Sequence, residues 1–213
     1  MLERRTKSIK NTYFRMKQNF HFTKHVIVQD YDPKWTKVFE DLKTVFKKHL
    51  GNSVLDIQHV GSTAVPGLAA KPVIDLDFIV ENENKLQEVI HKMKQLDYEY
   101  VGDYGIKGRE VFKRNSEQSP NDGSGRVWMK HHAYACIQGA VSLQNHLKFR
   151  DFLRSHPELA AEYGALKKQL AKEHPFDIDA YVEKKTPFIT SILKQVGFEK
   201  KDLEDIAEQN KAS

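Results

Sequence analysis

One stretch of 19 residues constrains this chain more than any other: HVGSTAVPGLAAKPVIDLD, residues 59–77. It joins two apolar segments, 54–60 and 72–80, through a Gly-Ser turn and a loop of small residues, and both segments predict β-strands. Asp75 and Asp77 lie two residues apart in the second strand, so they share one face, about 6.6 Å apart. Two like charges in an apolar run require a cationic partner. A hard divalent metal with oxygen ligands meets that need and also binds phosphate.

The spacing within this stretch adds a second constraint. Gly61-Ser62 is followed by twelve residues and then by Asp75-Leu76-Asp77. That order resembles the nucleotidyltransferase superfamily that includes DNA polymerase beta, where a Gly-Ser turn holds the triphosphate and an Asp-x-Asp pair binds metal. The longer string GSTAVPGLAAKPVIDLD is similar to the GrpB (UPF0157) family within that superfamily. The similarity covers about residues 25–197, at Tyr31-x-Pro33-x-Trp35, GDYGIKGR (102–109), His132, FRDFLRSHP (149–157) and LKKQLA (166–171).

The resemblance implies an enzyme that moves a nucleotide from a nucleoside triphosphate to an unknown small acceptor, with Mg²⁺ or Mn²⁺ as cofactor. Asp75 and Asp77 are the expected metal ligands and, with His132, the expected catalytic residues. The superfamily usually supplies a third carboxylate from a later strand, and this chain departs there, because segment 126–137 contains no acid. His132 is either a substitute ligand or base, or a structural histidine. Glu110 is a weaker candidate for the missing acid.

The candidates for phosphate binding fall into three groups. Gly61 and Ser62 bring backbone N–H groups close to phosphate oxygens, unless they form an ordinary tight turn; Lys71 stands just before the second strand. His146, Arg150 and Arg154 are spaced i, i+4 and i+8 on one expected helix, a cationic stripe that faces either phosphates or solvent. Arg109 ends a glycine-rich segment and is a possible substrate contact; Lys167 and Lys185 match family positions.

Composition separates a folded domain from its ends. The chain has 213 residues, 39% of them hydrophobic, which fits one domain with a sizeable core. Its net charge of +5 comes from residues 1–24, where seven Lys or Arg face a single Glu; the rest carries −1. Nucleic acid is therefore not an expected partner of the folded domain. The basic extension, with an apolar stripe at Ile9, Tyr13, Met16 and Phe20, is either poorly ordered or contacts a partner or an anionic surface.

We predict an α/β (α+β) fold: a nucleotidyltransferase-like mixed sheet flanked by helices, with a helical C-terminal part. The domain spans 25–197, after the extension 1–24 and before a charged tail, 198–213, that is expected to be frayed. Expected strands cover 25–29, 54–60, 72–80, 98–101, 106–113 and 126–137. Expected helices begin after Asp32-Pro33 and at about 83, 142, 157 and 178, the last of them interrupted or kinked at Pro187.

Other observations limit the function. No apolar run approaches 18 residues, so no membrane span is expected, and a single cysteine, Cys136, suits a cytoplasmic protein with an inert core thiol. Motifs of serine hydrolases and zinc enzymes are absent. The alternative to a transferase is a nucleotide-binding regulatory module that lost efficient catalysis, which the missing third carboxylate favours.

Overall fold

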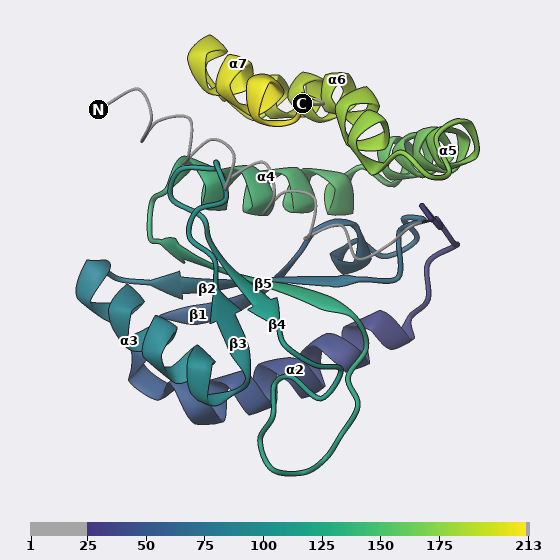
Figure 1. Cartoon of the computed structure of the whole chain (residues 1–213). Helices are drawn as coiled ribbons and strands as arrows, with labels where there is room; N and C mark the ends of the chain where they lie inside the picture. Colours follow the sequence, from purple (N-terminus) through teal and green to yellow (C-terminus); the bar gives the residue numbers. More distant parts are fainter. Residues whose placement is uncertain (1–24, 212–213) are drawn as a thin grey trace, which may run out of the picture.

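A five-stranded mixed sheet forms the centre of the protein, whose computed structural model describes residues 25–211. The strands follow the spatial order β1-β2-β5-β4-β3, and only β2 and β5 pair in parallel (Figure 1). The predicted mixed sheet is therefore confirmed. The strands are β1 (Asp56–Val60), β2 (Ile74–Val80), β3 (Tyr98–Tyr100), β4 (Glu110–Arg114) and β5 (His131–Ile137).

Helices cover both faces of this sheet. Helices α2 (Lys34–Leu50) and α3 (Glu83–Gln95) lie on one face, and α4 (Val141–Ser155) lies on the other (Figure 1). Beyond α4 lie α5 (Pro157–Glu173), α6 (Ile178–Gln195) and α7 (Lys200–Gln209), which confirms the helical C-terminal part. The sheet thus has one face that packs a core and a second face that meets α4 under the C-terminal helices.

The main core forms between α2 and the sheet. Apolar residues spaced along α2 are fully buried and pack against the face of β2 that carries Leu76 and Phe78. Each such side chain stabilises the fold by about 1.5–3 kcal/mol. Asp32 accepts a hydrogen bond from the backbone N–H of Lys34 (2.9 Å) at the start of α2, although Pro33 rather than Asp32 is the N-cap residue. The buried residues of α2 are Trp35, Phe39, Leu42, Phe46 and Leu50.

Several element boundaries differ from the predicted ones. Segment 25–29 forms only a single bridge, between Gln29 and Ala70, and residues 106–109 form a loop rather than a strand. Helix α6 continues through Pro187, so the proline does not interrupt it. The prediction of a frayed C-terminal end was wrong for α7, because Ile206 is buried against Leu193 and Phe198.

Two predictions concern the chain ends and the membrane. The basic extension 1–24, with its apolar stripe, lies outside the described residues. Across residues 25–211, the structure contains no helix with the length and apolar content that a membrane crossing requires.

Two neutral histidines are buried on the core face of the sheet. Burial lowers the pKa of His59 to about 4 and that of His131 to about 3. His59 stacks on Phe39, and the Nδ1 of His131 donates to the carbonyl of Met129 at 2.9 Å. Both pKa values lie below the unfolded value of about 6.5, so the folded chain binds fewer protons.

We therefore expect the contribution of these histidines to the free energy of unfolding to be fully present above pH about 6.5. The free energy of unfolding should then fall by a few kcal/mol as the pH approaches about 4. Urea unfolding at several pH values measures this loss. His131→Gln should reduce the slope, whereas His91→Gln, on the exposed face of α3, should not. An unchanged slope in His131→Gln would contradict this account.

Candidate functional site

The turn after β1 brings the backbone against the carboxylate of Asp75. Gly61 has φ +70°, and a Cβ atom on it would lie 2.4 Å from Asp75 Oδ2. Only glycine both adopts this conformation readily and leaves room for the carboxylate. The ladder explains the contact, because Val60 pairs with Asp75 across β1 and β2. The Gly-Ser turn and the first predicted metal ligand are thus immediate neighbours.

The two carboxylates of β2 are each held by a histidine. Asp75 and Asp77 share a face with His132 and Tyr134, their register partners on β5. His132 donates from Nδ1 to Asp75 Oδ1 at 2.9 Å, and His146 of α4 donates from Nδ1 to Asp77 Oδ2 at 2.8 Å. Asp77 is fully buried, and its Oδ1 atom has no hydrogen-bond partner among the described residues. Such an orphaned oxygen is a vacant acceptor for a cation or a donor.

The environment keeps Asp75 ionised. Burial alone would raise the pKa of Asp75, but the hydrogen bond and the charge of His132, together with Lys71 and His146, hold that pKa below its usual value. A carboxylate that stays negative in a partly enclosed site is suited to bind a metal ion or to orient a histidine.

Three lysines from different elements converge beside this pair. We call Lys71, Lys167 and Lys185 the lysine trio; they come from the loop before β2, from α5 and from α6. Lys167 is 2% exposed and donates from Nζ to Ser62 Oγ at 2.8 Å. Lys71 and Lys185 lie over the ring of Tyr181, and Lys167 lies over that of Tyr163. No ion pair joins any of the three to a carboxylate within residues 25–211.

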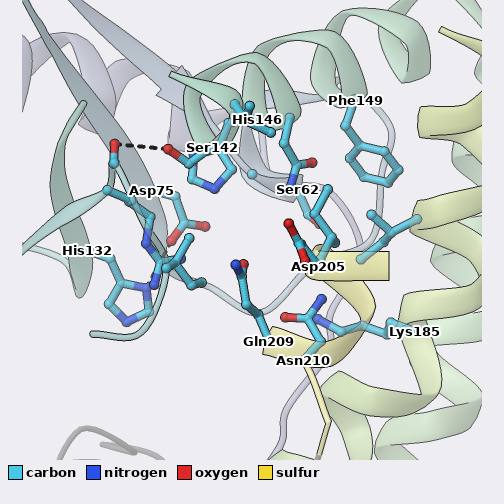
Figure 2. Close-up of a pocket in the computed structure, with 18 of the residues that line it drawn as sticks. Ser62, Asp75, His132, Ser142, His146, Phe149, Lys185, Asp205, Gln209 and Asn210 are labelled. Carbon is cyan, nitrogen blue, oxygen red and sulfur yellow. Dashed lines mark hydrogen bonds and ion pairs between the residues drawn. The ribbon is translucent and has the colours of Figure 1, made fainter. Parts of the chain in front are cut away.

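A cavity of about 570 Å³ connects Asp75 with the lysine trio. Figure 2 shows Asp75 and His132 on the strand side, with Ser62 and Lys185 across the space from them. Helix α7 contributes a polar wall that includes Asp205 and Gln209. The cavity therefore has anionic and cationic groups in one partly open volume, a combination that suits a charged small ligand.

The predicted site residues divide into two groups in space. Gly61, Ser62, Lys71, Asp75, Arg109, His132 and His146 line the cavity, and Asp77 lies behind His146. The loop before β4 places the Arg109 guanidinium 4.8 Å from the centre of the Tyr134 ring, and Arg109 Nε is buried without a partner among the described residues. These residues form one site.

Arg150 and Arg154 do not line this cavity. Arg150 is buried and donates to Gln58 Oε1 (2.7 Å) and to the carbonyl of His59 (2.9 Å), while Arg154 donates to the carbonyl of Ala64 (2.9 Å). Each further turn of α4 moves a side chain about 5.4 Å along the axis, so the predicted stripe leaves the site after His146. Their contacts indicate that both arginines position β1 and the Gly-Ser turn.

Glu110 does not supply the missing carboxylate. It pairs with Ala135 on β5, which places its side chain on the core face of the sheet, opposite to Asp75. Its carboxylate accepts a hydrogen bond from the Tyr100 hydroxyl at 2.7 Å.

Substituting Gly61 tests the close approach of turn and carboxylate. Gly61→Ala should destabilise the fold more than Gly67→Ala, by at least about 1 kcal/mol, because its methyl group must displace Asp75. Gly67 is a matched control: its φ is +79°, and an added Cβ meets nothing within 4 Å. Urea unfolding of both variants measures the difference. Equal losses of stability would show that backbone strain alone, about 1–2 kcal/mol, explains the effect.

Comparison with known proteins identifies the family. The model of the family described as GrpB protein matches residues 25–195. The UPF0157 protein YqkA of Bacillus subtilis is 37% identical over 75% of this chain, which spans 43% of that relative's length. The conserved protein GrpB from Enterococcus faecalis has 35% sequence identity to this chain. Its crystal structure superposes on this one with a TM-score of 0.66, over 80% of this chain and 99% of that one. The chain belongs to the GrpB family.

Proposed function

We propose that the protein is a metal-dependent nucleotidyltransferase that moves a nucleotide from a nucleoside triphosphate to a small acceptor. The observation that carries this proposal is the contact between the Gly-Ser turn and the carboxylate pair. A phosphate bound by the backbone N–H groups after Gly61 lies next to the oxygens of Asp75. The cavity volume of about 570 Å³ falls within the range of about 300–1,000 Å³ typical of small-molecule sites.

The site offers two of the oxygen ligands that a hard divalent ion requires, but not a complete set. Asp75 and Asp77 would hold it, and Asp77 Oδ1 accepts no hydrogen bond from residues 25–211 that would compete with the ion. Among the described residues, no three His, Cys, Asp or Glu side chains form a metal-binding group. The nucleotide's phosphates and water would therefore complete the coordination, as Mg²⁺ and Mn²⁺ sites often require. When bound, such an ion neutralises charge that develops on the phosphate and orients the acceptor.

The chain's own residues supply the remaining functions. Ser62 and Lys71 bind phosphate oxygens beside the turn. His132, positioned by its hydrogen bond to Asp75 (2.9 Å), supplies an imidazole for ligation or for accepting the acceptor's proton. Arg109, stacked on Tyr134, contacts the substrate at the opposite side of the carboxylates. We place this activity in the cytoplasm, where nucleoside triphosphates are made and where the buried thiol of Cys136 stays reduced.

The alternative is a nucleotide-binding regulatory module without efficient catalysis. Glu110 faces the other side of the sheet, and β5 supplies His132 where a third carboxylate is usual. A site with two carboxylates can hold a metal–nucleotide complex and still stabilise its transition state poorly, because catalysis requires charge stabilisation beyond ground-state binding.

Pyrophosphate release separates the two functions. Each triphosphate is incubated with Mg²⁺ or Mn²⁺ and a panel of hydroxyl and amine acceptors. For a transferase, Asp75→Asn, Asp77→Asn and His132→Ala should each lower release on the order of 10²-fold or more, and His132→Ala should leave nucleotide binding nearly intact. Asp122→Asn, in an exposed loop, is the control. Tight binding without release for every acceptor would favour the regulatory module.

A further inference from the structure

The lysine trio brings one buried and two half-buried lysines together, and none of them forms an ion pair with a carboxylate among residues 25–211. Lys167 is almost completely buried, yet within residues 25–211 its only hydrogen bond is to Ser62. The aromatic rings of Tyr163 and Tyr181 support the ammonium groups but carry no negative charge. Buried charges are normally paired, because an unpaired one loses its hydration without compensation. The trio therefore indicates an anionic ligand with several charges.

Burial and mutual repulsion oppose the positive charge of these lysines. Burial, together with the neighbouring lysines, lowers the pKa of Lys185 to about 7 and that of Lys167 well below its usual value. Burial also lowers the pKa of Lys71, although Asp75 opposes this shift. Each protonated amine of the trio disfavours the charge of its neighbours, so the three titrate as a coupled group.

We propose that the lysine trio and Ser62 form a polyphosphate subsite that binds the terminal phosphates of a nucleoside triphosphate without a metal ion and takes up protons as the anion binds. This subsite depends on the proposed function only for the identity of the ligand, a nucleoside triphosphate. The Ser62 hydroxyl, which accepts from Lys167, keeps its own proton to donate to a phosphate oxygen. Charge-assisted hydrogen bonds from lysine to phosphate favour the protonated amine, so binding raises its affinity for protons.

Other charged groups around the cavity do not remove the need for this anion. On the carboxylate side, Asp75 is engaged by His132, and His146 is engaged by Asp77. On the α7 wall, Asp202 and Asp205 make no ion pair with the trio among the described contacts. The charged and titratable groups that face the trio from the surrounding elements are Asp75, Arg109, Lys130, His132, His146, Tyr163, Tyr181, Asp202 and Asp205.

Calorimetry of the full chain with ATP, CTP, GTP and UTP tests the subsite, in EDTA and separately with Mg²⁺. At pH about 8 a terminal phosphate, whose second pKa is about 6, is already ionised, so protons exchanged on binding come from the protein. Buffers with different heats of protonation report the number exchanged. We expect binding in EDTA with uptake of about one proton per triphosphate, and about tenfold weaker binding at pH 9 than at pH 8.

Variants at Lys185 separate charge from protonation. Lys185→Met should take up fewer protons than the wild type and bind at least about tenfold more weakly, because the coupled group loses one of its three amines. Lys185→Arg should still bind but take up fewer protons, since a guanidinium stays charged. Lys184→Met, a change of the exposed neighbour on α6, should behave like the wild type.

The outcomes distinguish this inference from the proposed function. Binding only in the presence of Mg²⁺, binding without proton uptake, or full uptake by Lys185→Arg would each overturn the subsite and leave nucleotide transfer standing. An absence of binding to any triphosphate, with and without Mg²⁺, would overturn the proposed function as well.

Discussion

One close contact organises the site: the backbone of Gly61 against the carboxylate of Asp75. An added methyl group there would lie 2.4 Å from the carboxylate oxygen, so the contact requires both glycine and the register of β1 and β2. It places backbone donors, which attract an anion, beside a carboxylate, which attracts a cation. A ligand that contains both a metal ion and phosphate needs an anion-binding group and a cation-binding group side by side. The surrounding helices hold the Gly-Ser turn and Asp75 in this arrangement.

Each layer of the fold contributes to this arrangement. The core between α2 and the sheet holds β2 rigidly, so Asp75 and Asp77 project from its other face. Helix α4 supplies His146 to one carboxylate and uses Arg150 to fix the carbonyl of His59 just before the turn. Helices α5 and α6 bring lysines to the opposite side of the cavity, and α7 closes it with polar side chains. Cations and anions therefore come from elements that only the folded chain brings together.

The sequence predicted the parts of the site that depend on local spacing. The Gly-Ser turn and the Asp-x-Asp strand are close in the chain, and strand alternation correctly placed His132 on the face of Asp75. Contacts between distant helices could not be predicted this way. Helical spacing grouped Arg150 with His146, but the direction of α4 carries Arg150 away from the cavity. The cavity-facing roles of Lys167 and Asp205 depend on helix packing. The charged composition of α7 hid its two apolar anchors, the buried Ile206 and the half-buried Leu203.

The central claim is that the carboxylate pair and the lysine trio bind opposite ends of one metal–nucleotide complex. A crystal structure with Mn²⁺ and a non-hydrolysable nucleoside triphosphate tests it most directly, because anomalous scattering locates the metal. The account predicts a peak within about 2.0–2.3 Å of oxygens from Asp75 and Asp77, with the terminal phosphate hydrogen-bonded to Lys167 and Ser62. A nucleotide bound outside this cavity, or a metal held away from both carboxylates, would contradict it.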